Sequence, residues 1–235
     1  VMVWPGRTTM PYKGFTKGRA ILVTPEELEV VRHKVPGISR ISPEMRTSKR
    51  IRYGRNEYNN TIRGVNAEYE FMRNTIAGAG RFLNPLDIRH RKRVCLLGSK
   101  LAKNLFAGEK PVGKKVLVEG IPFTVVGVMI EKVQSSNYGG MRDENCLFMP
   151  YTTFTAIYGR KYVNNIVLEP ADPGNASAVI ANLRQFLGER LGFDPRDEDA
   201  LGLWDFTELE SSVNVFFLAF QVFLGIIGSF TLLVG

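Results

Sequence analysis

The feature that most constrains this chain is its last stretch, residues 213–235, which contains no charged side chain. At ~1.5 Å per residue, a helix of this length covers about 34 Å, and the hydrocarbon core of a bilayer is about 30 Å thick. A buried core helix rarely runs this long without a charge. The stretch therefore predicts a transmembrane helix. Small residues at helical spacing predict its face for packing against another membrane helix, and these are Gly225, Gly228 and Ser229.

The residues before this span indicate its orientation. Between positions 194 and 210 there is one basic residue, Arg196, against seven acidic ones: Asp194, Asp197, Glu198, Asp199, Asp205, Glu208 and Glu210. Cytoplasmic flanks usually collect Lys and Arg, so we expect the preceding domain to lie outside the cytoplasm. The chain opens on a strand-like VMVW and stops inside the apolar span. We therefore expect the full-length protein to continue both ways, with a membrane segment or signal upstream.

Composition excludes several classes of protein. Of the 235 residues, 44% are hydrophobic and 23% charged, which is typical of a folded chain. The net charge of +8 permits anionic partners without demonstrating one. Two cysteines exclude a disulfide framework. We expect Cys95 and Cys146 to be buried thiols, although a disulfide between them is chemically possible outside the cytoplasm. His33 and His90 are far apart and have no carboxylate or cysteine cluster nearby, so we expect no metal site.

Local signals predict a mixture of helices and strands before the span. Thr24, Pro25 and Glu27 predict a capped helix that ends before Pro36, and Asn84-Pro85 predicts a short basic helix through Arg93. Ser99 is the expected N-cap of an apolar-faced helix, and Asp172-Pro173 is the expected start of a longer one. Strands are predicted at 38–42, 94–98, 146–150 and 164–170. Two separate hairpins are predicted, one turning at 54–56 and one around 119–120. The polar residues 131–144 predict a mobile loop.

These elements predict an α+β fold. Helix–strand units at either end flank a strand-rich middle, which favours one domain inserted into another. We expect the outer subdomain to comprise residues 1–75 and 160–210, with the inserted subdomain at 76–159 and the membrane helix at 213–235.

One segment imitates a nucleotide-binding loop. Residues 108–114 match the pattern G-x-x-x-x-G-K. Lys115 stands where such loops need a Ser or Thr hydroxyl for magnesium, and the predicted neighbours are a helix before and a strand after. The order is the reverse of what phosphate binding requires, so we interpret the segment as a turn and expect no ATPase in this chain.

No other pattern carries catalytic chemistry. Basic runs at 46–55 and 89–93 lack the reading element that nucleic-acid binding needs, so we expect a solvated face or a contact with an acidic partner or a lipid surface. No G-x-S-x-G motif and no paired nucleophile and base are found. We expect no enzyme activity, cofactor or nucleic-acid partner.

Several spaced motifs together resemble the periplasmic core domain of MacB-like ABC-transporter permease proteins. They are Gly80-Arg81-Phe82, VCLLG ending at Gly98, a helix ending at Phe106, Pro111-Val-Gly113-Lys and IPFTVVGV with Gly127. TIRGV at 61–65 and PGI followed by ISP at 36–43 resemble earlier signatures of the family, and the terminal apolar helix resembles the second transmembrane helix of an FtsX-like permease. The departures are Cys95 and Cys146 at usually aliphatic positions and a longer acidic stretch at 192–203.

The resemblance implies a permease of the bacterial inner membrane with its soluble domain in the periplasm. It implies an α/β porter-like subdomain interrupted by a β-rich sabre-like one, a homodimer or heterodimer of permeases, and an ATPase on a fused or separate cytoplasmic subunit. A periplasmic adaptor and outer-membrane channel are possible further partners beside membrane lipid. Such proteins transmit ATP-driven helix movement to the outer domain, so we expect a continuous helix from about Thr207 inward.

Three alternatives remain open. Within the family, the chain could serve an FtsX-type regulator of an envelope hydrolase, or a permease for lipoprotein release. In another class, it could be a single-span envelope enzyme or adhesin. The residues identify neither a substrate, nor a direction of transport, nor a docking surface.

Overall fold

The computed structural model describes residues 1–131, 142–204, 220–221 and 224. Within these ranges no helix is both long enough and apolar enough to cross a membrane. The expected membrane helix, with Gly225, Gly228 and Ser229, lies almost entirely outside the described residues. The same is true of most of the loop expected at 131–144 and of the continuous helix expected from Thr207.

The fold is mixed α+β, as predicted. The described strands form one sheet with the order β10-β1-β9-β2-β3-β8-β5-β7-β4, and β6 pairs with both β2 and β7. The strands are β1 (Met2–Pro5), β2 (Ile38–Tyr53), β3 (Asn56–Val65), β4 (Ala77–Gly80), β5 (Val94–Leu97), β6 (Lys115–Val118), β7 (Ile121–Met129), β8 (Leu147–Pro150), β9 (Asn165–Pro170) and β10 (Leu201–Trp204). The helices are α1 (Pro25–Lys34), α2 (Tyr69–Met72), α3 (Pro85–Arg89), α4 (Ser99–Phe106), α5 (Tyr151–Tyr158) and α6 (Ala176–Leu191), with short 3-10 turns η2 (Asp143–Asn145) and η3 (Pro173–Asn175).

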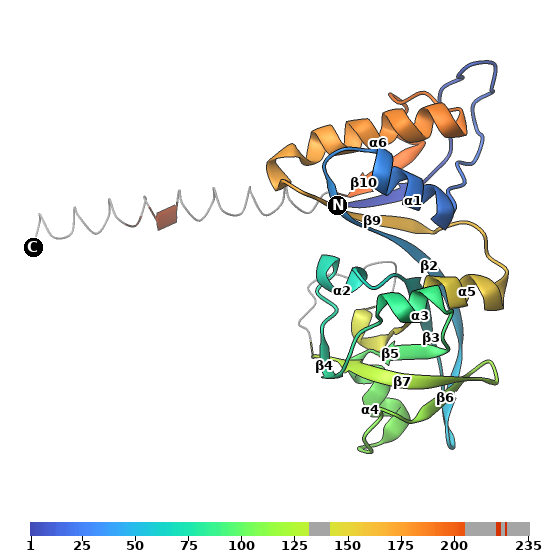
Figure 1. Ribbon diagram of the computed structural model, residues 1–235, viewed down its shortest axis with the longest axis vertical. Coiled ribbons are helices and arrows are strands. Elements are labelled where there is room, and N and C mark those ends of the chain that lie inside the picture. The colour runs from blue at the N-terminus through green and yellow to red at the C-terminus, as the bar shows by residue number, and fades with distance from the viewer. Residues whose placement is uncertain (132–141, 205–219, 222–223, 225–235) are drawn as a thin grey trace, which may run out of the picture.

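Both ends of the described domain meet in one lobe, which we call the terminal lobe. Here β10, β1, β9 and the first half of β2 lie beside α1 and α6 (Figure 1). The apolar face of α6 packs inward, with Val179, Leu183 and Leu187 buried among side chains of α1 and the sheet. The buried residues of this core come from 3–41 and from 163–201.

The remaining strands form a second lobe, which we call the middle lobe. Strands β2, β3, β8, β5, β7 and β6 each pair with the next, and β6 returns to β2. The circuit is therefore closed, and closure removes the unpaired edges that an open sheet of this size would expose. Helices α4 and α5 supply Leu101, Leu105 and Phe154 to its core, whose buried residues lie within 45–154.

Strand β2 runs through both lobes, which corrects the sequence prediction. A strand at 38–42 and a separate hairpin were expected, whereas the structure has one sixteen-residue strand. Its first half pairs with β9 up to Glu44, and its second half pairs with β3 from Met45 onward. The continuity was missed because Ser42 and Glu44 are polar but completely buried, so the apolar alternation that marks a half-buried strand is interrupted.

Local capping signals are mostly confirmed. Thr24 and Glu27 form the predicted capping box of α1, and Asn84 caps α3, which ends at Arg89 and not at Arg93. The N-cap of α4 is Gly98, so the prediction of Ser99 was wrong by one residue. Asp172-Pro173 opens the turn η3, and α6 follows it. Strand β10, inside the acidic stretch, was not predicted.

Candidate functional site

The most unusual feature of the described chain is a set of charged side chains buried where the two lobes meet. Arg63 of β3 forms an ion pair with Asp143 of η2 at 2.6 Å, and neither side chain is exposed to solvent. Arg73, just after α2, lies 3.8 Å from the other carboxylate oxygen of Asp143. Two positive and two negative groups, counting Glu44, therefore share one enclosed space. We call this set, with Tyr69, the junction cluster.

Hydrogen bonds extend the junction cluster from one lobe to the other. The hydroxyl of Tyr69 donates to Glu44 at 2.6 Å, and Arg63 Nη1 donates to the same hydroxyl at 3.4 Å. Asn165 of β9 donates to Glu44 at 3.3 Å from the terminal-lobe side. The cluster thus links β2, β3, α2, η2 and β9, which belong to both lobes.

Burial and neighbouring charges act against each other in this cluster. Burial disfavours the charge on Arg63, but the surrounding negative groups outweigh it and hold its guanidinium pKa well above the usual range. Burial and the Glu44 carboxylate together raise the pKa of the Tyr69 hydroxyl. Tyr69 therefore stays a neutral donor at every physiological pH. A buried charged group needs a partner, so removing any one member leaves another uncompensated.

Apolar side chains of both lobes enclose the junction cluster. Val65, Leu96, Cys146 and Phe148 of the middle lobe pack in one cluster with Val167 of β9. The phenyl rings of Tyr69 and Phe148 lie with centroids 6.0 Å apart. The side chains of Arg63 and Asp143 have no solvent access here, which strengthens the ion pair between them.

The predicted motif residues lie in the middle lobe, and several mark close backbone approaches. Gly80 has φ +74°, and a Cβ there would lie 2.2 Å from the carbonyl oxygen of Val126. A Cβ on Gly127 would lie 2.3 Å from the carbonyl oxygen of Arg81. A Cβ on Gly98 would lie 2.4 Å from the carbonyl oxygen of Glu144. Strands β4 and β7, and the start of α4 against η2, can approach this closely only with glycine.

Two further motif residues fix the segment around α3. Arg81 forms an ion pair with the buried Asp87 at 2.6 Å, and Asp87 also completes a capping box with Asn84. The Arg81 guanidinium and the capping hydrogen bonds outweigh burial and lower the pKa of the Asp87 carboxyl. Phe82 is buried against Phe148 beside the junction cluster.

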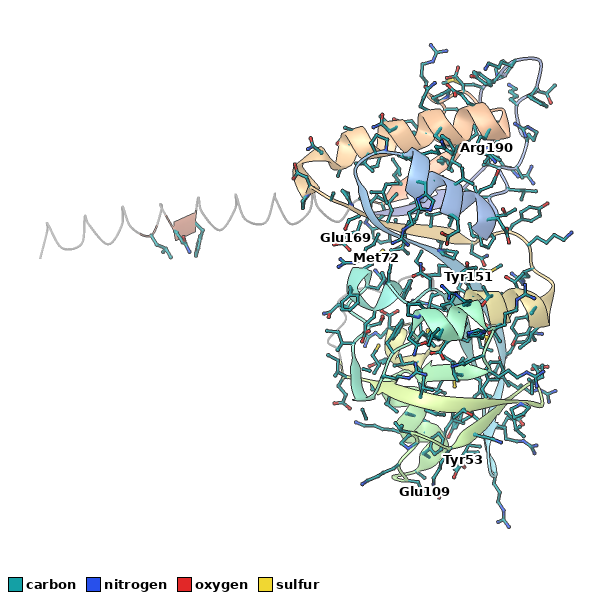
Figure 2. All side chains as sticks on the ribbon, in the orientation of Figure 1. Tyr53, Met72, Glu109, Tyr151, Glu169 and Arg190 are labelled. Carbon is teal, nitrogen blue, oxygen red and sulfur yellow. The ribbon has the colours of Figure 1, made fainter. Side chains whose placement is uncertain are left out.

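The remaining motif residues, Phe106, Pro111 and Gly113, lie at the far end of the middle lobe. The ring of Phe106 stacks on Tyr53 with centroids 4.0 Å apart, and the Tyr53 hydroxyl donates to Glu109 at 3.0 Å (Figure 2). Lys114 forms an ion pair with the same carboxylate. A helix precedes this segment and strand β6 follows it, so no helix N-terminus is available for a phosphate. The structure agrees with the interpretation of residues 108–114 as a turn.

The other candidate residues do not come together. Cys95 and Cys146 are buried free thiols, so the possible disulfide is absent. Within the described ranges, no group of three His, Cys, Asp or Glu side chains could hold a metal ion. The five members of the junction cluster were not singled out from the sequence, although Arg63 inside the apolar strand TIRGV was a usable signal.

Known proteins share both the sequence pattern and the fold. The model of the MacB-like periplasmic core domain matches residues 1–186. A macrolide export ATP-binding/permease protein MacB from Bdellovibrio bacteriovorus is 24% identical over 93% of this chain and 33% of its own length. The protein of the same name from Rhodospirillum rubrum is 29% identical over 78% of this chain and 29% of its own length. The chain thus spans about a third of these curated relatives.

Solved structures confirm the fold. The periplasmic region of MacB from Actinobacillus actinomycetemcomitans has a TM-score of 0.71 and 18% identity, and the match covers 91% of each chain. The extracellular domain of the noncanonic ABC-type transporter YknZ from Gram-positive bacteria has a TM-score of 0.69 and 19% identity over 86% of this chain and all of that one. Since the family model covers far more than half of the residues, this chain belongs to the family of MacB-like periplasmic core domains.

Proposed function

We propose that this chain is the extracytoplasmic domain of an ABC-transporter permease, which couples cytoplasmic ATP hydrolysis to export or envelope transport by mechanical transmission. The family membership supports the permease. The coupling is supported by one observation above all, the passage of strand β2 through both lobes beside the buried Arg63–Asp143 pair. A displacement imposed at the ends of the domain, which both lie in the terminal lobe, would reach the middle lobe through this connection.

The proposal includes the wider assembly. The permease would sit in the bacterial inner membrane with this domain in the periplasm, as a homodimer or heterodimer with a fused or separate ATPase. Its partners would include membrane lipid and, for export, a periplasmic adaptor and an outer-membrane channel. The ATP would be hydrolysed outside the residues of this chain, which would itself not be catalytic.

We also propose that the two lobes act as the porter-like and sabre-like subdomains. The division into 1–75, 76–159 and 160–210 stays a prediction. The two cores favour a boundary inside β2 where the chain first passes from the terminal lobe to the middle lobe. The first segment of the terminal-lobe core ends at Ile41, and the middle-lobe core begins at Met45.

The test uses the full-length permease with its ATPase. A flexible Gly/Ser linker inserted after Ser212 should abolish transport while leaving ATP hydrolysis, because the domain would no longer follow the predicted membrane helix. Erythromycin efflux is a suitable probe, since the relatives carry the name macrolide export. The matched control is the same linker at the exposed Gly54–Arg55 turn, which should leave both activities intact.

Other outcomes separate the alternatives. Unchanged transport with the Ser212 linker would refute mechanical coupling. Release of lipoproteins without efflux would favour a lipoprotein permease, and activation of a co-purified wall hydrolase would favour an FtsX-type regulator.

A further inference from the structure

A cleft of about 500 Å³ lies between the two lobes. Helix α1 of the terminal lobe contributes Glu29 and Arg32 to one wall, and α3 and α5 of the middle lobe form the other with Ile88, Arg89 and Tyr151. The floor is the connection from β3 to α2, at residues 66–68. Tyr151 (labelled in Figure 2) and helix α3 (labelled in Figure 1) lie on the middle-lobe side of the cleft, opposite α1.

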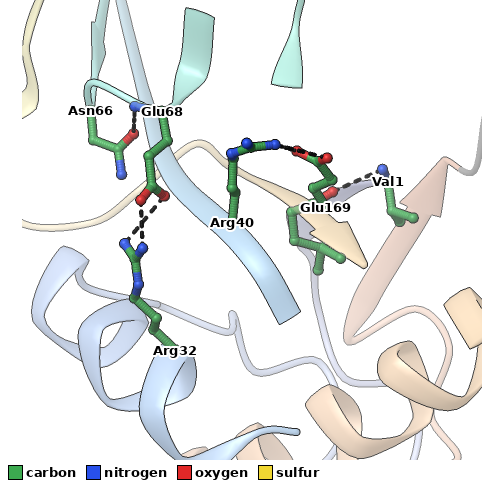
Figure 3. A network of polar contacts seen from close by, with 7 residues as sticks. Val1, Arg32, Arg40, Asn66, Glu68 and Glu169 are labelled. Carbon is green, nitrogen blue, oxygen red and sulfur yellow. Dashed lines mark hydrogen bonds and ion pairs between the residues drawn. The ribbon is translucent and has the colours of Figure 1, made fainter. Parts of the chain in front are cut away.

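The floor is tied to both α1 and β2. Arg32 makes two hydrogen bonds to Glu68, at 2.5 and 3.2 Å (Figure 3). The backbone N–H of Glu68 donates to Asn66, and the side chain of Asn66 donates to the carbonyl of Ile41 at 2.8 Å. The next residue along, Tyr69, enters the junction cluster. The floor of the cleft is therefore bonded to α1 and β2, and it adjoins the junction cluster.

Hydrogen bonds hold the two helices of the second wall together. The hydroxyl of Thr152 donates to the carbonyl of Ile88 at 2.6 Å, and that of Thr153 donates to the carbonyl of Lys92 at 2.9 Å. These bonds fix α3 to α5. Arg89 is thereby presented to the cleft from a rigid support.

Opposite charges face each other across the cleft without meeting. Glu29 and Arg89 both line it and are both exposed. Of the ion pairs between described residues, none involves either side chain, although the Glu29 carboxylate interacts electrostatically with Arg32 of the same helix. In the part of the chain that the structure describes, no hydrogen bond or ion pair joins α1 directly to α3 or α5. Burial raises the pKa of the Tyr151 hydroxyl, and the negative charges of Glu29 and Glu26 raise it further, so the charge of α1 reaches the second wall.

The geometry points to a cleft that closes, with the terminal lobe turning toward α3 and α5 until Glu29 pairs with Arg89. The hinge is at the crossing of β2, near Ile41 to Pro43, and at the floor residues 66–68. Motion about this hinge leaves the junction cluster packed, whereas the cleft side offers empty space and an attractive pair of charges. The inference rests on the proposed function, because closure would be the domain's response to movement of the membrane helices.

The first experiment measures closure by cross-linking in the full-length permease with its ATPase in nanodiscs. The double variant Glu29→Cys with Arg89→Cys is oxidised mildly without nucleotide and again with ATP and vanadate. A disulfide needs Cα atoms within about 7 Å, so it forms only when the two walls come close together. We expect the disulfide to form, with a yield that differs between the two conditions. The native thiols Cys95 and Cys146 are buried and do not compete.

The matched control is an Arg–Glu ion pair that is already formed inside one lobe. Arg40 of β2 and Glu169 of β9 are paired across neighbouring strands at 2.8 Å (Figure 3). The double variant Arg40→Cys with Glu169→Cys should cross-link equally in both conditions. If this control cross-links and the Glu29/Arg89 pair never does, the closing cleft is refuted, even where ATP-driven transport persists. Equal Glu29/Arg89 yields with and without nucleotide would support closure and contradict the proposed coupling.

The second experiment tests the role of the ion pair. Spin labels at the exposed positions Lys34 and Arg91 report the distance between the lobes. Glu29→Gln should reduce the closed population about two- to fivefold, which is the weight of one exposed ion pair. The exchange Glu29→Arg with Arg89→Glu should restore it. An unchanged distance distribution in Glu29→Gln would overturn the assignment of this pair.

Discussion

Arg63 and Asp143 are eighty residues apart in the chain and form an ion pair of 2.6 Å with no solvent access to either side chain. The pair joins a strand of the middle lobe to the turn η2, and Glu44 and Tyr69 connect it to β2. It is thus positioned to make the two lobes one mechanical unit on that side of the junction.

Breaking this pair should be costly. Asp143→Ala leaves the guanidinium of Arg63 buried, with the longer hydrogen bond to the Tyr69 hydroxyl in place of the ion pair. The neighbouring Arg73 is also a cation and cannot compensate the charge of Arg63. We expect a loss of about 3–5 kcal/mol in the free energy of unfolding, measured by urea titration of residues 1–204 with circular dichroism.

The control replaces both charges by apolar groups. Arg63→Met with Asp143→Leu should recover part of the loss, because one cation and one anion are removed together and the cluster keeps one of each, Arg73 and Glu44. A double variant as unstable as Asp143→Ala would show that the pair itself, and not the uncompensated charge, supports the fold.

Gly127 should tolerate no side chain. Gly127→Ala places a Cβ 2.3 Å from the carbonyl oxygen of Arg81, so β4 must move away from β7. We expect a loss of about 1–3 kcal/mol from this overpacking, measured by the same titration. Gly174→Ala is the matched control, because its Cβ would meet only ordinary contacts at 3.4 Å and beyond. Equal stabilities of the two variants would contradict the close approach.

Stability in acid should depend on Asp197, which is buried and accepts hydrogen bonds from Thr9 and Met10 at 2.7–2.9 Å. Burial opposes its charge, but these bonds outweigh burial and lower its pKa. A carboxyl with a lowered folded-state pKa stabilises the fold above its unfolded pKa of about 3.9, and this contribution is lost as the pH falls through the folded pKa.

Asp197→Asn should therefore be less stable than the parent at about pH 7 and nearly equal to it at about pH 2, measured by urea unfolding at both values. The control Glu198→Gln changes a side chain that is 82% exposed, so its stability should follow the parent at each pH. A constant gap between Asp197→Asn and the parent would argue against a titrating carboxylate.

The two thiols should be unreactive in the folded domain. Burial raises the pKa of Cys95, and burial raises that of Cys146 to about 12. Because only the thiolate reacts, labelling with a disulfide reagent at about pH 8 should be slow, and both thiols should appear at once on unfolding. Rapid labelling of one thiol without denaturant would indicate local opening around its strand.

The sequence by itself determined the local elements with chemical start and stop signals. Examples are the Thr24 and Glu27 capping box, the Asn84-Pro85 helix start and the glycine turns. Each depends on residues within a few positions of each other, so the chemistry of adjacent residues is enough. The same holds for the spaced motifs at Gly80–Phe82 and Pro111–Gly113, which identified the family.

Only the tertiary structure decided how the lobes are joined. Strand β2 crosses the junction at polar residues whose burial no local pattern reveals, and β10 completes a sheet edge formed by the other end of the chain. Glu44 and Asp143 read as ordinary surface charges in sequence, because the side chains that they contact lie 25 to 121 residues away. Whether a charge is solvated or enclosed depends on what packs around it, and that is set by the assembled fold.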